Sequence, residues 1–405
     1  MRVNQNDKQI IRELAKRYME LAGHPVMQER RQAWSDVKDL KMSRPPVLVE
    51  VDFIQDFVEP GSILCVDEQA QYVEKRLRKA IKHAEIGDDF IMAPSYKYYL
   101  DVETSDYGVD IERVHSTSSD GSNLGHAFKT PIETPDDFAK LKKRTFSFDV
   151  EKTNSEAEYL TELFGETMPL ERAGKGSFLI SLTRDLFCLL GAENFLVWLY
   201  EYPEEYKWLI NYLCEDRLSL YEYNEKQGAI SSGNIPLPIG SGSYGLVSQL
   251  PDGLGLKLSD VWVWAESQES EGISPEHFSE FFLPSIAKIS NRFGLTYYGC
   301  CERLDDRWEH VVKAINNIRA VSISPWSHLD AMGEKLGKDY VFSRKPNPTF
   351  IGGQTANWDM LRQDIQNTIN AAKNCNFEIV FRDLYNKEIS IERLSEWVKM
   401  VKGMI

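Results

Sequence analysis

The sequence predicts an α/β fold in which helices cover a parallel β-sheet, and a (β/α)₈ TIM barrel fits the pattern best. From residue 47 onward, short apolar runs alternate with amphipathic helical stretches, as in successive βαβ units. In the second half, several of these runs end in a polar or reactive cluster. Reactive side chains at the carboxyl ends of many strands are typical of the active site of a (β/α)₈ barrel.

The elements can be assigned in order along the chain. Residues 7–40 predict two amphipathic helices, interrupted at Gly23-His24-Pro25. The first strand is expected at 47–53, and later strands at 90–92, 229–232, 258–264, 295–300, 318–324, 340–343 and 377–381. Helices are expected at 275–293, 305–314, 327–336, 358–373 and 391–404. We therefore expect a helical extension over residues 1–45 and the barrel over residues 46–405.

Composition restricts the class of protein. Among 405 residues, 62 acidic and 47 basic side chains give a net charge of −15. Nucleic acids and anionic membrane surfaces attract Lys and Arg clusters, so neither is expected as a partner. Six cysteines are too few for a disulfide framework, and no run of apolar residues is long enough to span a membrane. We expect a cytoplasmic protein.

The strand expected at 295–300 ends in the most reactive group of side chains in the sequence. Cys300, Cys301 and Glu302 follow Tyr298 directly. Thiolates and a carboxylate form a suitable ligand set for Zn²⁺. Adjacent residues of a strand point to opposite faces, so only one thiol should face the interior unless the chain turns. The alternative is that both cysteines are small buried residues at the end of a strand.

Two later strand ends carry charged candidates. Asp383 follows the last expected strand and could be a metal ligand or a general base, or could simply pair with Arg382. Arg344 and Lys345 precede Pro346-Asn347-Pro348, a rigid turn that holds both cations near the same rim. They could bind an anionic group, or they could be solvated surface cations.

Other candidates are aromatic or polar. Trp326 follows a strand and could form a stacking wall, and Glu266 and Gln268 follow an earlier strand as possible substrate-binding groups together with Tyr298. The stretch 239–245 has the spacing GxGxxG, but no long helix follows it to bind a pyrophosphate. We expect this stretch to be a flexible loop near the active site.

Taken together, these stretches resemble the uroporphyrinogen decarboxylase superfamily, and within it the branch of corrinoid-dependent methyltransferases. The resemblance rests on residues 39–46, 267–284, 298–302, 322–326 and 343–348, and on the Asp383 strand with its closing helix. It covers most of the chain.

The resemblance implies a zinc-assisted enzyme that moves a methyl group between a small methylated substrate and a corrinoid (cobalamin) carried by a partner protein. The branch usually binds zinc through His-x-Cys and a later Cys. Here no His precedes Cys300 or Cys301 at that spacing, and Asp383 stands at the position of the later Cys. The implied metal ligands are therefore Cys300, Cys301, Glu302 and Asp383, with Glu302 and Asp383 also catalytic. Trp326, Arg344 and Lys345 are the implied cofactor-binding residues.

Two alternatives remain open. A decarboxylase of porphyrin biosynthesis would need several cations and the motif RQAGRY, of which Arg31-Gln32-Ala33 matches only the first three letters before Trp34-Ser35. A non-catalytic barrel that binds a corrinoid protein or a tetrapyrrole would not need thiols and carboxylates together.

Overall fold

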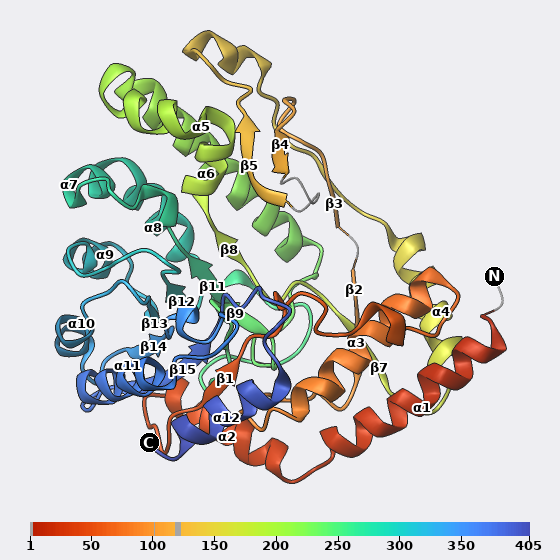
Figure 1. Cartoon of the computed structure of the whole chain (residues 1–405). Coiled ribbons are helices and arrows are strands. Elements are labelled where there is room, and N and C mark those ends of the chain that lie inside the picture. The colour runs from red at the N-terminus through yellow and green to blue at the C-terminus, as the bar shows by residue number, and fades with distance from the viewer. Residues whose placement is uncertain (1–2, 101, 118–122) are drawn as a thin grey trace.

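The computed structural model describes residues 3–100, 102–117 and 123–405, and its centre is a sheet of seven parallel strands (Figure 1). The strand order is β1-β15-β14-β13-β12-β11-β8. The strands are β1 (Val47–Val49), β8 (Leu179–Ile180), β11 (Trp262–Ala265), β12 (Leu295–Tyr298), β13 (Ile318–Ile323), β14 (Val341–Arg344) and β15 (Asn376–Phe381). The expectation of an α/β fold with a parallel sheet is confirmed.

The closed barrel is not confirmed, because β1 and β8 are the edges of the sheet and no ladder among the described residues joins them. The strand expected at 90–92 does not form, and residues 229–232 contribute only isolated bridges. Smaller pairs follow instead: β2 (Tyr96–Tyr99) with β7 (Leu170–Ala173), β3 (Val102–Thr104) with β6 (Phe146–Phe148), and β4 (Glu112–Thr117) with β5 (Asn123–Lys129).

Helices cover the outer face of the sheet (Figure 1). Those expected from the sequence are α8 (Leu283–Ser290), α9 (Trp308–Ala314), α10 (Leu329–Leu336), α11 (Trp358–Ala371) and α12 (Ile391–Lys402), with α7 (Pro275–His277) and a π-helical stretch (Phe278–Phe282) leading into α8. Outward-pointing strand residues such as Val47, Val49 and Phe381 join these helices in the largest apolar cluster. Burial of this surface is the main force that holds the layers together.

The remaining helices form the two ends of the molecule. They are α1 (Gln5–Ala22), α2 (Val26–Lys38), α3 (Glu68–Ala84), α4 (Val150–Phe164), α5 (Leu182–Glu201) and α6 (Pro203–Lys226). In Figure 1, α5, α6 and the β4–β5 hairpin form an upper lobe, and α1 to α3 lie to the right of the sheet and below it. No helix within the described ranges is long and apolar enough to cross a membrane.

The inner face of the sheet packs on a hairpin formed by β9 (Pro238–Gly240) and β10 (Ser243–Tyr244). This is the glycine-rich stretch, so a buried hairpin replaces the expected flexible loop. Gly240 makes the packing possible, because a Cβ atom there would lie 2.3 Å from Cδ1 of Tyr297. The glycine at this position therefore allows the hairpin backbone to lie directly against the Tyr297 ring.

A buried ion pair connects α2 to the inner face. The side chains of Lys38 and Glu378 are completely buried and form a salt bridge. Lys38 Nζ also donates to Ser243 Oγ (2.8 Å), and Glu378 accepts from Ser343 Oγ (2.5 Å). Residues of the expected helical extension thus contribute to the interior of the sheet.

Candidate active site at the carboxyl edge of the sheet

The carboxyl ends of the parallel strands bring charged side chains to one edge. Side chains alternate along each strand, so residues two positions beyond an inward-pointing apolar residue also point inward. Val380 lies in the inner cluster and is followed by Arg382, and Leu48 is followed in the same way by Glu50. Lys345 and Glu266 occupy the equivalent positions beyond β14 and β11. All four side chains are at least nine-tenths buried.

The two thiols lie side by side at the end of β12. Gly299 has a φ of 94°, which turns the chain so that the Sγ atoms of Cys300 and Cys301 come within 3.8 Å. Cys300 is buried and Cys301 is exposed. The contact with Cys300 lowers the pKa of Cys301, and the same contact together with burial raises the pKa of Cys300. Cys301 is therefore the reactive thiol of the pair.

A pair of buried carboxyl groups lies beside the thiols. Glu302 is 1% exposed and accepts from the backbone N–H groups of Ser267 and Cys300, both at 2.9 Å. Glu266 is 2% exposed and accepts from Ser181 Oγ. Burial raises the pKa of both carboxyls, and the nearby charge of Glu302 raises that of Glu266 further. Two carboxyls so placed do not both ionise near neutral pH, so one can donate a proton.

Two basic side chains, Lys345 after β14 and Arg382 after β15, also lie at this edge of the sheet. Arg382 Nε lies 3.2 Å from Glu50 Oε2 and 3.6 Å from Asp383 Oδ1. Lys345 Nζ donates to Ser343 Oγ (2.7 Å), and burial lowers the pKa of Lys345 to about 7. Arg382 Nη1 is buried and has no hydrogen-bond partner among the described residues. An unpartnered buried donor at this edge is suited to a ligand.

Asp383 itself has an unusual backbone. Its φ of 61° lies in the left-handed region, which residues other than glycine seldom adopt. Such conformations are concentrated at functional sites. Its carboxylate faces Arg382 and accepts from the hydroxyl of Tyr385 (3.3 Å).

Two of the residues predicted from the sequence do not reach the inner edge. Arg344 points toward α11, where its Nη2 pairs with Asp364 Oδ1 (2.5 Å) and its Nε donates to Thr368 Oγ1 (3.0 Å). Tyr298 is completely buried in the outer apolar cluster. Gln268 is closer to the site, since its backbone N–H donates to Glu266 Oε2 (3.0 Å).

Three residues at this edge were not predicted from the sequence as site residues: Glu50, Arg382 and Ser181. Residues two positions apart on a strand point to the same face, so the apolar Leu48 could have indicated that the Glu50 carboxylate points inward. Ser181 had no such signal, because β8 contains only two residues and its sequence merges into the apolar start of α5.

The residues expected to bind zinc do not assemble into a metal site. The two thiols are together, but Glu302 accepts from backbone N–H groups and Asp383 faces Arg382 and Tyr385. Among the residues that the structure describes, no group of three or more His, Cys, Asp or Glu side chains could hold a metal ion. In this arrangement the donor set does not fit a tetrahedral zinc ion.

Exposed aromatic rings follow the strands at the same edge. Phe53 lies beyond β1 and is 45% exposed, and Trp326 and Tyr385 lie beyond β13 and β15 and are each 60% exposed. The rings of Phe53 and Tyr385 are in contact, with centroids 5.7 Å apart. Large rings left in solvent at the rim of a site offer stacking surfaces to a flat ligand.

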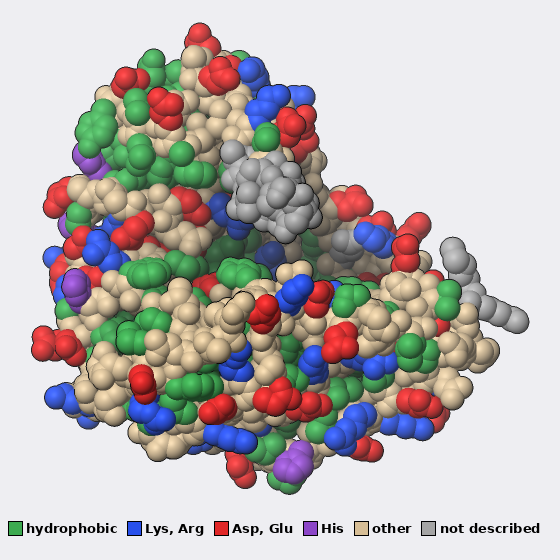
Figure 2. Space-filling model, in the orientation of Figure 1, with side chains coloured by type: hydrophobic (Ala, Val, Ile, Leu, Met, Phe, Trp, Pro, Cys, Tyr) green, Lys and Arg blue, Asp and Glu red, His purple; other side chains and the backbone are tan. Residues whose placement is uncertain are grey.

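A cavity of about 330 Å³ adjoins Glu50. Leu48, Tyr96, Tyr99 and Gly242 contribute to its walls. Figure 2 shows a hollow between the upper lobe and the body of the molecule. The cavity has the size of a pocket for a small molecule.

Comparison with known proteins gives the fold but no family. No protein-family model matches the chain, and no curated protein matches it. Nineteen chains of solved structures match. One is a methyltransferase from Methanosarcina mazei, with a TM-score of 0.50 and 10% sequence identity over 92% of this chain and 98% of that chain. At this identity the likeness shows a shared fold along nearly the whole length of both chains.

Proposed function

We propose that this protein is an enzyme that moves a methyl group between a small methylated substrate and a corrinoid carried by a partner protein. The observation that carries the proposal is the juxtaposition of an exposed thiol, Cys301, with the buried carboxyl pair Glu266 and Glu302 at one sheet edge. The fold shared with the methyltransferase from Methanosarcina mazei supports it.

The proposed chemistry assigns proton transfer to this chain. When bound, a corrinoid supplies a cobalt centre that accepts or gives up a methyl group. The Glu266–Glu302 pair gives a proton to the heteroatom that loses its methyl group, so this heteroatom leaves with its charge neutralised. In the opposite direction the same pair takes the proton back.

We propose a partner protein because no cavity described above is large enough to enclose a corrinoid. The cavity of about 330 Å³ beside Glu50 is too small for a macrocycle with its side chains. The exposed rings of Phe53, Trp326 and Tyr385 instead offer a flat surface at the rim. We propose that the corrinoid is presented there from outside.

Two finer expectations belong to this proposal. We propose that the seven-stranded sheet derives from a (β/α)₈ barrel, with residues 90–92 and 229–232 in place of regular closing strands. Zinc stays a prediction from the resemblance, and proton transfer by the carboxyl pair does not depend on it. Metal analysis of the purified wild type and Cys301→Ser tests zinc separately.

Reduced cobalamin tests the proposed function. Purified protein is mixed with cob(I)alamin and a panel of methanol, methylamines, methylthiols and methoxylated aromatics, and methylcobalamin is followed by its absorbance. Wild type should methylate cobalamin with at least one donor. Glu266→Gln should reduce the rate by about 100-fold, because general acid catalysis is lost. Glu280→Gln, an exposed carboxylate that pairs with Lys207, is the matched control and should have no effect.

Two outcomes contradict the proposal: no transfer from any donor, or equal rates in wild type and Glu266→Gln. Stepwise loss of carboxyl groups from uroporphyrinogen under the same conditions would support a decarboxylase instead.

A further inference from the structure

We propose that a second pocket, between α5, α6 and the β4–β5 hairpin, binds the oxyanion of an organic ligand, namely a carboxylate or a phosphate. Its assignment to the methylated substrate rests on the proposed function. The pocket has a volume of about 420 Å³ and is lined by three arginines, Arg113, Arg184 and Arg217. In a chain with a net charge of −15, such a concentration of guanidinium groups requires an explanation.

Two of the three arginines are available for a ligand. Arg113 and Arg184 are exposed, and neither forms an ion pair with any described residue. The guanidinium of Arg113 lies 5.6 Å from the ring centroid of Phe128, which holds it over the pocket wall. Guanidinium groups bind carboxylates and phosphates through paired N–H donors.

The third arginine is fixed by its neighbours. Arg217 donates to Asp185 Oδ2 (2.5 Å) and to the carbonyl of Leu179 (3.1 Å), and its Nε is buried with no hydrogen-bond partner among the described residues. Asp185 is the carboxylate that lines the pocket. Glu269, also nearby, already accepts from Thr183 Oγ1 (2.8 Å). Among the residues that the structure describes, the three cations therefore exceed the acidic groups that face them.

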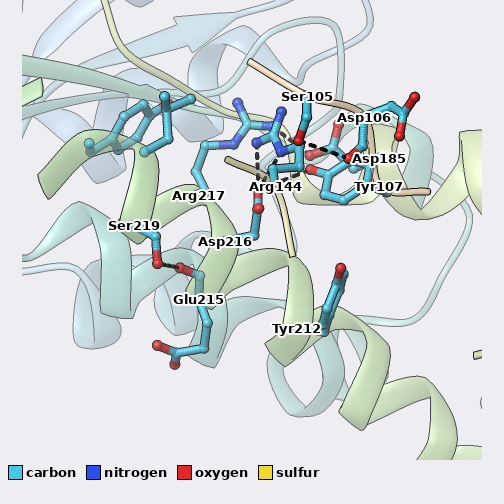
Figure 3. A network of polar contacts seen from close by, with 12 residues as sticks. Ser105, Asp106, Tyr107, Arg144, Asp185, Tyr212, Glu215, Asp216, Arg217 and Ser219 are labelled. Atoms are coloured by element: carbon cyan, nitrogen blue, oxygen red, sulfur yellow. Dashed lines mark hydrogen bonds and ion pairs between the residues drawn. The ribbon is translucent and has the colours of Figure 1, made fainter. Parts of the chain in front are cut away.

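A network of polar contacts makes this wall of the pocket rigid. Figure 3 shows Arg144 and Arg217 directed toward the same group of acidic side chains. Arg144 Nε donates to Asp216 Oδ2 (2.9 Å), and the Tyr107 hydroxyl donates to the same oxygen (3.3 Å). Because these contacts hold the residues beside Arg217 in place, binding loses little conformational entropy in ordering the wall.

The pocket can also accommodate the apolar part of an organic ligand. One of its lining residues contacts the carboxyl pair. Phe128 and Leu179 form apolar walls. Ser181 lines the pocket and at the same time donates to Glu266 Oε1. A ligand whose oxyanion is held by Arg113 and Arg184 can therefore extend its other end toward Glu266.

Calorimetric titration tests the pocket directly. Wild type is titrated with phenyl phosphate, benzoate and inorganic phosphate. We expect one site per chain, with at least one aromatic probe bound more tightly than inorganic phosphate because of the apolar walls. Arg113→Met/Arg184→Met should weaken binding by about tenfold or more, because two charge-assisted hydrogen bonds are lost. The control Lys313→Met/Arg362→Met removes two exposed cations from α9 and α11 and should bind like wild type.

Each outcome decides a part of the proposal. The proposal that this pocket binds an oxyanion is wrong if wild type binds none of the probes saturably, or if the Arg113/Arg184 variant binds them as tightly as wild type. Equal affinity for the aromatic and inorganic anions would show that the pocket does not select an organic ligand. The stronger of phenyl phosphate and benzoate identifies the oxyanion. The titration contains no methyl donor and no corrinoid, so its result is independent of the methyl-transfer assay. If the probes bind but the protein transfers no methyl group, the oxyanion pocket is supported and only its assignment to the methylated substrate is wrong.

Discussion

At the scale of single residues, the cysteines differ in what surrounds each thiol. Cys65, Cys214 and Cys375 are buried, and burial raises the pKa of each. Cys301 is exposed, and its neighbour Cys300 lowers its pKa. Since the thiolate is the nucleophile, these environments separate one reactive thiol from several inert ones.

Alkylation should therefore select Cys301. With limiting iodoacetamide at about pH 7, peptide mass spectrometry should find Cys301 modified about tenfold or more faster than Cys65, Cys214 or Cys375. Cys300→Ser should slow the labelling of Cys301, because the thiol contact that lowers its pKa is removed. Equal labelling of exposed and buried thiols, or faster labelling in the variant, would show that the contact does not activate Cys301.

Lys345 gives a pH-dependent contribution to stability. Burial lowers its pKa from 10.5 to about 7 in the folded protein. Between these values the unfolded chain binds more protons, so this group makes the folded state more stable as the pH rises. Relative to Lys345→Met, the free energy of unfolding of wild type should increase by about 2 kcal/mol from about pH 7 to about pH 9.

Urea unfolding at several pH values measures this difference, and Lys313→Met, which removes an exposed lysine, provides the control. A difference between wild type and Lys345→Met that stays constant, or falls with pH, would mean that Lys345 remains charged in the folded protein.

At the scale of elements, the contact between α2 and β15 combines apolar packing of Trp34 and Val37 with one buried ion pair. Lys38 and Glu378 have no exposed surface, so removing one partner leaves a buried charge without compensation. Glu378→Gln should lower the free energy of unfolding by about 3 kcal/mol or more, and Lys38→Met/Glu378→Leu should recover part of the loss.

A partly exposed ion pair provides the comparison. Lys8 and Glu162 lie 2.7 Å apart, and Glu162 is partly exposed, so Glu162→Gln should lower the free energy of unfolding much less than Glu378→Gln does. Urea unfolding of all four proteins tests the prediction. A Glu378→Gln loss no larger than that of Glu162→Gln would show that the buried pair does not fix α2 to the sheet.

The elements that the sequence predicted share a clear pattern. Helices such as α11 and α12 have one apolar face and begin at a capping Asn or Ser, so periodicity identifies them. Helix α5 lacks this pattern, because the chain bends at Gly191, whose φ is 75°, so Leu186 and Leu190 lie before the bend and Leu196 and Tyr200 lie after it. A bend inside a helix interrupts its apolar period.

At the scale of the whole molecule, the sequence showed which strand ends carry polar and charged residues but not how their side chains point. Lys345 reaches the inner edge and Arg344 does not, since alternation from Val341 places them on opposite faces. The position of the Glu302 carboxylate depends on the turn at Gly299, whose φ a sequence pattern does not specify. Long-range contacts decide both the ligand set and the closure of the sheet.

Net charge is similarly a poor guide to the ligand. The value of −15 argued against nucleic acids and anionic membranes as partners, yet Lys345 and Arg382 lie at the inner edge and three arginines line the second pocket: Arg113, Arg184 and Arg217. Recognition of a ligand depends on side chains of one sign clustered at its site, whereas the net charge of the chain affects solubility and long-range association.

The pH dependence of methyl transfer to cob(I)alamin tests the central claim most directly. If a protonated carboxyl of the Glu266–Glu302 pair donates the proton, the rate should be highest below the raised pKa of Glu266 and fall as the pH rises above it. Glu266→Gln should be slow and lose this decline. A rate that rises with pH across the neutral range, or the same profile in wild type and Glu266→Gln, would contradict the assignment of this edge as the catalytic site.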